Sequence, residues 1–153
     1  MICFLSYSTS QRERVFAYRL QTLAGASDIE VLLPVREGHD AKSETRNRIR
    51  RSDVVLAFFS TSGAAARDEV HFAQELGKPV LALVPKNRRR PAIRGIRWIE
   101  YDPADLRLAG VEKQVLDELR NMGAKKDRST ALLLVLLGLG LLALLAPRKG
   151  RAA

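Results

Sequence analysis

The sequence predicts an α/β fold, in which a doubly wound, five-stranded parallel sheet carries helices on both sides. Short apolar segments of strand length alternate along the chain with longer segments of helical periodicity. The segment 53–60, DVVLAFFS, is apolar apart from its first and last residues, as is typical of a central parallel strand. The tripeptide Gly77-Lys78-Pro79 then separates a helical segment from the next apolar run. These observations favour strand–helix units wound around one sheet.

The first half of this sheet is expected to contain two strands and two helices. Residues 2–7 are a short apolar and aromatic run, which predicts a buried first strand. Ser10 and Glu13 have the spacing of a capping box, which predicts a helix over 11–25 that ends at Gly25. The expected buried stripe of that helix is Val15, Phe16, Arg19, Leu20 and Leu23. A second strand at 29–33, a polar loop at 35–40 and a basic helix at 43–51 follow.

The second half continues the same order. The strand at 53–60 leads to a helix over 64–76, a strand at 80–84 and a basic loop at 85–95. A short strand at 98–101 and a final helix over 105–122 complete the predicted domain. On the helix 64–76, one face carries the expected apolar stripe Ala65, Ala66, Glu69, Phe72, Ala73 and Leu76.

Glu69 is the one ionisable residue on that stripe. A carboxylate on an apolar face must find a partner or line a pocket, because burying it alone is costly. The sequence therefore leaves two interpretations open. Glu69 either pairs with a nearby arginine at the rim of the domain, or it belongs to a functional site.

Open parallel sheets bind ligands at the carboxyl ends of their strands. In this chain those ends carry Ser6, Tyr7 and Ser8, the segment 34–39, and the hydroxyl residues 60–62. They contain no glycine-rich phosphate loop and no acidic cluster, which argues against a phosphate-accepting receiver domain. Cys3 is the single cysteine and is expected to be a core thiol, so no structural zinc site and no disulfide framework are expected.

The net charge of +9 is concentrated at the end of the chain. Residues 1–123 carry a net charge of +4 and residues 124–153 carry +5. The basic composition therefore does not indicate nucleic-acid binding, and no nucleic-acid partner is expected. The two histidines, His39 and His71, fall in different elements, so no metal centre is expected either.

Residues 131–146 contain only Leu, Ala, Val and Gly, and ten of these sixteen residues are leucine. Such a run spans roughly 24 Å as a helix, and its flanking residues extend it toward the ~30 Å hydrocarbon core of a bilayer. We therefore expect a transmembrane helix at 130–147, after a basic linker at 124–129 and before a basic tail at 148–153. Because no signal peptide is recognised, the domain 1–123 is expected in the cytoplasm, with the last helix as a tail anchor. A buried core helix is the alternative.

Four segments make the chain similar to a Toll/interleukin-1 receptor (TIR) domain of bacterial type. They are FLSYS at 4–8, IRRSD at 49–53 running into the strand, EVHFA at 69–73, and LGKPV at 76–80. Together with the strand order, they extend the resemblance over about residues 2–122. Each segment is weak alone, and the order and spacing of the four make the resemblance fairly specific.

The resemblance implies that the domain cleaves NAD at the nicotinamide–ribose bond. Many TIR domains of this kind use one glutamate of the third helix, a position that Glu69 matches. Ser6, Tyr7, Ser8 and Arg36 match positions that border the nucleotide, and Ser60 at the end of the third strand is added as a substrate-binding candidate. NAD would be the substrate, with no cofactor or metal required. The resemblance also implies self-association through TIR domains and a role in defence signalling.

Two other functions stay open at this stage. One is a catalytically inactive adaptor that acts by TIR–TIR assembly at the membrane, because Ala65 stands where family members often carry an aromatic residue. The other is a nucleoside deoxyribosyltransferase-like enzyme, which Glu69 and the segment 77–80 also resemble. The opening motif of that enzyme family is absent, so it is the least favoured of the three functions.

Overall fold

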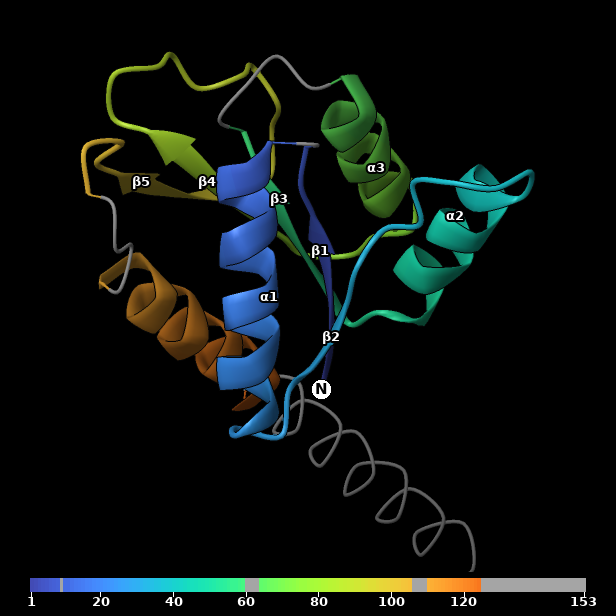
Figure 1. The fold of residues 1–153 in the computed structure, drawn as a ribbon, viewed down its shortest axis with the longest axis horizontal. Coiled ribbons are helices and arrows are strands. Elements are labelled where there is room, and N and C mark those ends of the chain that lie inside the picture. The colour runs from blue at the N-terminus through green and yellow to red at the C-terminus, as the bar shows by residue number, and fades with distance from the viewer. Residues whose placement is uncertain (9, 60–63, 106–109, 125–153) are drawn as a thin grey trace, which may run out of the picture. The chain divides into compact units, whose positions relative to one another are not determined.

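The structure is a computed structural model that describes residues 1–8, 10–59, 64–105 and 110–124 (Figure 1). Its elements, in chain order, are β1 (Ile2–Ser6), α1 (Gln11–Gly25), β2 (Glu30–Leu32), α2 (Ala41–Arg51), β3 (Val54–Phe58), α3 (Ala64–Glu75), β4 (Val80–Pro85) and β5 (Ile96–Tyr101). Residues 110–124 are also helical. The chain divides into two compact units, Met1–Val115, which contains the whole sheet, and Leu116–Ala153, of which residues 116–124 are described.

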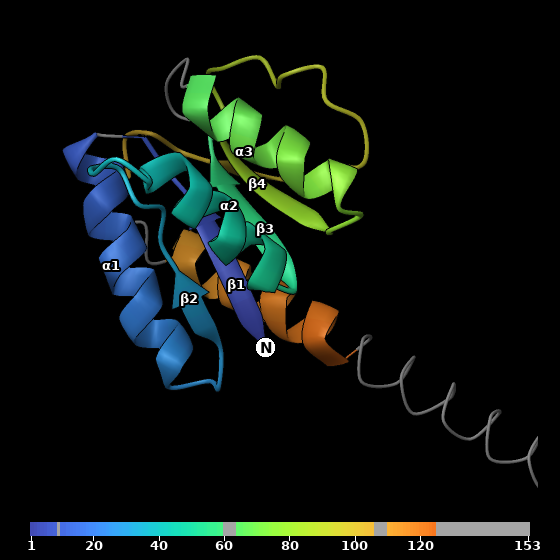
Figure 2. The same ribbon diagram turned by 90° about the vertical axis from the view of Figure 1, so that its right-hand side faces the viewer.

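The five strands form one sheet in the order β2-β1-β3-β4-β5, and all neighbouring strands are parallel. The strands β1, β3 and β4 lie inside the sheet, and β3 and β4 are buried at every position. The chain first winds from β1 to the edge strand β2 and then returns across β1 to β3 (Figure 2). The predicted doubly wound parallel sheet is therefore confirmed.

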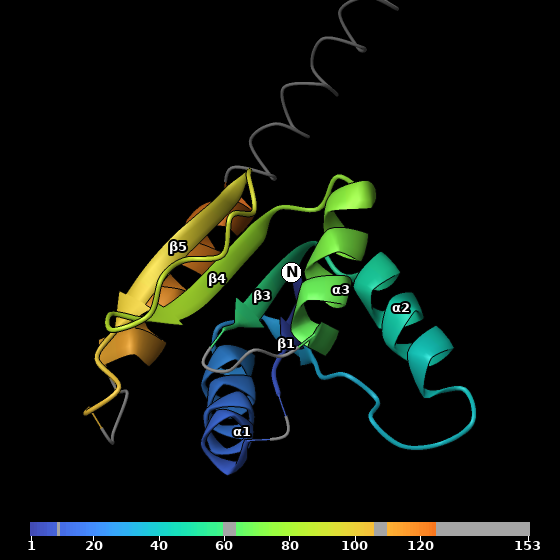
Figure 3. The same cartoon turned by 90° about the horizontal axis from the view of Figure 1, so that it is seen from above.

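The helices α2 and α3 cover one face of the sheet, and α1 lies on the other face (Figure 3). On the α2–α3 face, a continuous cluster joins Ile49 of α2 and Val70 of α3 to alternate residues of β3, including Val55 and Ala57. On the α1 face, the ring of Phe16 packs edge-on against Phe58 with 4.9 Å between the ring centroids. Because successive strand residues point to opposite faces, this alternation gives the molecule two apolar layers.

The buried stripe of α1 differs from the prediction. Val15 and Leu23 are exposed at 51% and 42%, whereas Ala17 and Ala24 are fully buried. The buried set is Glu13, Phe16, Ala17, Leu20 and Ala24. Alanine presents little side chain, so it lets a helix backbone approach a sheet closely, and the larger Val15 and Leu23 remain exposed.

The start of α1 also differs from the prediction, because the capping box of Ser10 does not form. Ser10 is the N-cap residue, but its side chain makes no capping hydrogen bond. The Glu13 carboxylate instead accepts a hydrogen bond of 2.5 Å from the backbone N–H of Ser8. Glu13 therefore ties the end of β1 to the helix, and this role explains its burial.

Within the described residues, no helix has the length and apolar character needed to cross a membrane. The transmembrane helix expected at 130–147, the tail after it and the expected linker from residue 125 onward lie outside the described residues. Cys3 is fully buried in β1, and burial raises the pKa of its thiol to about 12.

Candidate active site

Glu69 lies on the buried side of α3, as its position in the apolar stripe predicts. The buried residues of this helix are Ala66, Glu69, Val70 and Ala73. The stripe is rotated relative to the prediction, since Ala65 and Leu76 are exposed and Val70 is fully buried. The Glu69 side chain retains 9% exposure, so its carboxylate lies at the margin between the core and a surface cleft.

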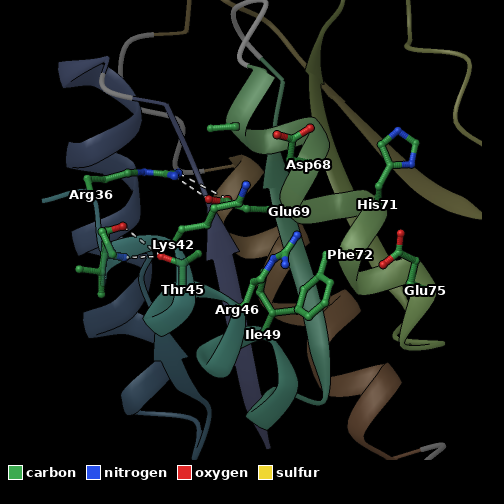
Figure 4. A pocket seen from close by; sticks show the side chains of 13 residues that line it. Arg36, Lys42, Thr45, Arg46, Ile49, Asp68, Glu69, His71, Phe72 and Glu75 are labelled. Carbon is green, nitrogen blue, oxygen red and sulfur yellow. Dashed lines mark hydrogen bonds and ion pairs between the residues drawn. The ribbon is translucent and has the colours of Figure 1, made fainter. Parts of the chain in front are cut away.

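Two residues from other elements bind the Glu69 carboxylate. The hydroxyl of Ser6, the last residue of β1, donates a short hydrogen bond to Oε2. The Arg36 guanidinium donates through Nη1 to Oε1 at 2.5 Å and through Nη2 to Oε2 at 3.4 Å (Figure 4). Both interpretations left open by the sequence are therefore combined, because Glu69 pairs with an arginine and also lines a cavity.

Arg36 is held in place by the residues after β1. Its Nη2 donates a hydrogen bond of 2.6 Å to the backbone carbonyl of Tyr7, and its guanidinium lies 5.9 Å from the centroid of the Tyr7 ring. With the contacts to Glu69, Arg36 joins the loop after β2 to both β1 and α3. The side chain is 28% exposed, which leaves it room to move.

The loop that carries Arg36 is fixed at Val35 by a single residue of α2. The buried Thr45 hydroxyl accepts a hydrogen bond from the Val35 N–H at 2.9 Å and donates one to the Val35 carbonyl at 3.0 Å. Gly38 follows with a φ of +104°, a conformation that favours glycine, where the chain turns toward α2. The orientation of Arg36 therefore depends on the contact between this loop and α2.

The cleft has a volume of about 610 Å³ and is bounded by the loop at 35–36, α2 and α3 (Figure 4). Its cations all come from the loop and α2, and its anions all come from α3. The residues that line it are Val35, Arg36, Ala41, Lys42, Thr45, Arg46, Ile49, Ala65, Asp68, Glu69, His71, Phe72 and Glu75. This volume falls in the range of small-molecule sites, roughly 300–1,000 Å³.

The structure brings together some of the residues expected at the site but not all of them. Ser6 and Arg36 bind the Glu69 carboxylate directly, and Tyr7 is linked to it through Arg36. Ser8 instead supports the start of α1, because its N–H donates to Glu13 and its Oγ accepts from the N–H of Ser10 at 3.2 Å. Ser60 lies outside the described residues.

Sequence reasoning did not identify Lys42, Arg46 and Phe72 as site residues. The two cations are four residues apart on α2, which places them on one face of that helix. Nothing in the sequence says which face of this highly charged helix points to the cleft. His71 also lines the cleft, whereas His39 is exposed on the loop.

The phenol of Tyr7, beside Arg36, has a pKa above its ordinary value. Burial raises the pKa of its phenol, and the nearby Arg36 opposes this shift. Among the described residues, no three His, Cys, Asp or Glu side chains lie close enough together to hold a metal ion. The arrangement offers a carboxylate at the end of a cleft, with a partly exposed arginine paired to it.

Sheet order and site together define an α/β domain with the Glu69 carboxylate in a cleft beside the carboxyl end of its first strand. A family model described as the TIR domain matches residues 3–120. The chain therefore belongs to the TIR domain family. A comparison with curated protein sequences found no significant match.

Solved structures of two enzymes share this fold. One is the CMP N-glycosidase BcmB of Clostridium botulinum, with a TM-score of 0.55 and 17% identity over 78% of this chain and 99% of that chain. The other is the 2-deoxyribosyltransferase of Bacillus psychrosaccharolyticus, with a TM-score of 0.57 and 14% identity over 69% of this chain and 96% of that chain. At these identities the likeness establishes the fold alone.

Proposed function

We propose that this TIR domain cleaves NAD at the nicotinamide–ribosyl bond, with Glu69 as the catalytic residue. The observation that carries the proposal is the placement of this nearly buried carboxylate at a cleft of about 610 Å³. Membership in the TIR family supports it, as does the fold shared with two enzymes named for N-glycosidase and deoxyribosyltransferase activity.

The reaction needs few protein groups. The nicotinamide of NAD is a pyridinium cation, so it can leave as a neutral base without a proton from a general acid. The ribose then develops oxocarbenium character, which a nearby carboxylate stabilises, as in glycoside hydrolysis. Glu69 supplies this carboxylate, and the Ser6 hydroxyl orients it through Oε2.

Arg36 must leave the Glu69 carboxylate before a substrate can approach Oε1. Its partial exposure permits this movement, and a dinucleotide offers phosphate oxygens as replacement partners. Arg36 is therefore a substrate-binding residue in this proposal, with Ser6 and Tyr7 beside it. Ser8 remains a proposed substrate contact because of the family resemblance, and Ser60 because of its place at the end of the third predicted strand.

The wider setting is also proposed. The apolar run at 131–146 acts as a tail anchor that holds the TIR domain on the cytoplasmic side of a membrane. Anchored domains meet at a high effective concentration, which favours self-association through TIR domains. NAD loss or an ADP-ribose-type product would then serve a defence response.

A catalytically inactive adaptor is the second candidate function. The observation that favours it is that both oxygens of the Glu69 carboxylate already accept hydrogen bonds, from Ser6 and from Arg36. This arrangement would also suit a purely structural ion pair. The exposed Ala65 gives no ring against which a nicotinamide could stack.

The deciding experiment measures NAD consumption by the full chain reconstituted in liposomes at high surface density, with products identified by mass spectrometry. We expect nicotinamide release by the wild-type chain and a loss of at least about a hundredfold in Glu69→Gln, since one catalytic electrostatic contact contributes on that order. Glu75→Gln, on the same helix and cleft, is the matched control. Equal turnover in wild type and Glu69→Gln, or none in either, would favour the adaptor.

A further inference from the structure

We propose that Lys42 and Arg46 form a subsite for a phosphate group of a nucleotide, and that Phe72 positions Arg46 within it. The subsite lies on the α2 side of the cleft that holds Glu69. The choice of a nucleotide rests on the proposed function, whereas binding of a phosphate-bearing ligand can be measured whether or not NAD is cleaved.

The two cations share one face of α2. Lys42 and Arg46 are separated by four residues, one turn of the helix, and both line the cleft (Figure 4). Two donor groups one turn apart on a helix are spaced to reach different oxygens of the same phosphate. Their charges therefore act on the same volume of the cleft.

These two cations also differ from Arg36 and Arg48 in lacking a carboxylate partner among the described residues. Arg36 pairs with Glu69, and Arg48 pairs with Glu44 at 2.7 Å. Within the described ranges, neither Lys42 nor Arg46 forms an ion pair with a carboxylate. Positive charge without an ion pair on the α2 side of the cleft attracts an anion there, whereas Asp68 and Glu75 lie on the α3 side.

Phe72 holds the guanidinium of Arg46 at the cleft. This guanidinium lies 4.8 Å from the centroid of the Phe72 ring, and that of Arg50 lies 5.2 Å from the same centroid. An arginine stacked on a ring samples fewer conformations than a free one, so it loses less entropy when it binds a ligand. Phe72 is thus a positioning residue that acts through Arg46.

The location suits the 5′-phosphate of a nucleotide whose anomeric carbon lies at Glu69. Glu69 and Phe72 are three residues apart on α3, which is about 4.5 Å along the helix axis. In a nucleotide, the sugar ring separates the anomeric carbon from the 5′-phosphate, a separation of similar order. With the anomeric carbon at Glu69, the phosphate therefore falls near the turn of α3 that faces Arg46.

The test compares AMP with adenosine as ligands of the wild-type full chain in detergent micelles, by isothermal titration calorimetry. We expect AMP to bind about tenfold more tightly or better, because one charge-assisted hydrogen bond is sufficient for such a difference. Lys42→Ala with Arg46→Ala should reduce AMP affinity to the level of adenosine and leave adenosine affinity unchanged. Retained adenosine binding shows that the variant is folded.

The matched control removes two charges elsewhere, by Arg51→Ala with Lys113→Ala. Both residues are exposed and neither lines the cleft, so AMP affinity should not change. Equal affinities of the wild-type chain for AMP and adenosine would overturn the subsite. An equal loss of AMP affinity in the control would also overturn it, since the attraction would then be general.

The positioning role of Phe72 has its own readout. Phe72→Leu should weaken AMP binding and leave adenosine binding unchanged, and Phe72→Tyr should restore AMP binding. A loss of both ligands in Phe72→Leu would show a packing role instead.

Failure of the proposed function can be distinguished from failure of the subsite. If the wild-type chain cleaves NAD, Lys42→Ala with Arg46→Ala should raise KM about tenfold and change kcat less. If it cleaves no NAD but still prefers AMP through Lys42 and Arg46, the catalytic proposal fails and the subsite stands. Turnover with an unchanged KM in the double variant would overturn the subsite alone.

Discussion

Arg36 and Glu69 each depend on the other for a charge partner at the margin of the core. The Glu69 side chain is 9% exposed and that of Arg36 is 28% exposed, so the pair is only partly screened by water. Truncating one partner of such a pair leaves the other charge poorly solvated, which costs more than the pair contributes. The same residues that the proposed reaction requires are therefore also part of the stability of the domain.

This dependence predicts a coupling between substitutions at the two positions. Arg36→Ala should lower the free energy of unfolding by about 1–2 kcal/mol, because Glu69 keeps only Ser6 as a partner. In the Glu69→Gln background the same substitution should cost less, since no buried charge is left behind. Denaturant unfolding followed by the fluorescence of Trp98 measures both values, and additive effects would contradict the coupling.

Glu112 is a second carboxylate whose environment affects stability. It accepts a hydrogen bond from Arg19 through Oε2 at 3.0 Å, while its buried Oε1 has no hydrogen-bond partner within the described residues. Burial raises the pKa of Glu112 above its ordinary value of 4.5, and the charge of Arg19 opposes this shift only in part.

The raised pKa predicts how stability depends on pH. The folded state binds a proton at Glu112 more readily than the unfolded state. Ionisation of Glu112 therefore lowers the free energy of unfolding as the pH rises from about 4.5 through the pKa of Glu112 in the folded state. Glu112→Gln removes this pH-dependent contribution. The free energy of unfolding of the variant should therefore fall less than that of the wild type between pH 4.5 and 7. Parallel pH profiles of the two proteins would contradict this expectation.

At the scale of elements, the contact between α2 and the loop after β2 fixes the backbone that carries Arg36. Thr45 binds both backbone groups of Val35, directly before Arg36. Thr45→Val keeps the shape of the side chain but removes both hydrogen bonds, so it should lower stability by about 1–3 kcal/mol. It should also increase hydrogen exchange of the Val35 amide and raise KM for NAD.

Thr22→Val provides the control for this prediction. The Thr22 hydroxyl donates to the Tyr18 carbonyl at 3.1 Å on the exposed side of α1, far in sequence from the loop. It should change stability little and leave Val35 exchange unchanged. Unaltered Val35 exchange in Thr45→Val would show that the loop is fixed by other contacts.

The elements themselves were predictable where the sequence pattern is unambiguous. The continuous apolar run of β3 can form only a strand covered on both faces, and Glu69 is conspicuous as a charge on an apolar stripe. The burial of α1 was harder to predict, because Ala17 and Ala24 pack against the sheet while Val15 is exposed. Apolar character alone does not show how closely a helix approaches a sheet.

The site was predictable only in part for a related reason. Arg36 was expected from the family resemblance, and its contact with Glu69 joins residues 33 positions apart. The cleft-facing side of α2 could not be read from the sequence, since only Thr45 and Ile49 of that helix are buried. Too few apolar residues mark its inner face, so only the tertiary structure shows that Lys42 and Arg46 line the cleft.

At the scale of the whole molecule, we propose that the described domain and the apolar run at 131–146 have separate tasks. Residues 3–120 match the TIR family and contain the candidate site. In this proposal, the anchor affects activity by confining copies of the domain to a surface. Confinement raises effective concentration, so turnover per molecule should increase with surface density.

Removal of residues 125–153 tests this division. The shortened chain should stay in the supernatant when liposomes are sedimented, whereas the full chain should sediment with them. Its NAD turnover should fall to the level of the full chain at low surface density, because the site is intact and only the confinement is lost. A hexahistidine tag at the new C-terminus, with nickel-chelating lipids, should then restore turnover without the native anchor. Sedimentation of the shortened chain with plain liposomes would contradict the anchor, and failure of the tag to restore turnover would show that the removed segment acts by more than tethering.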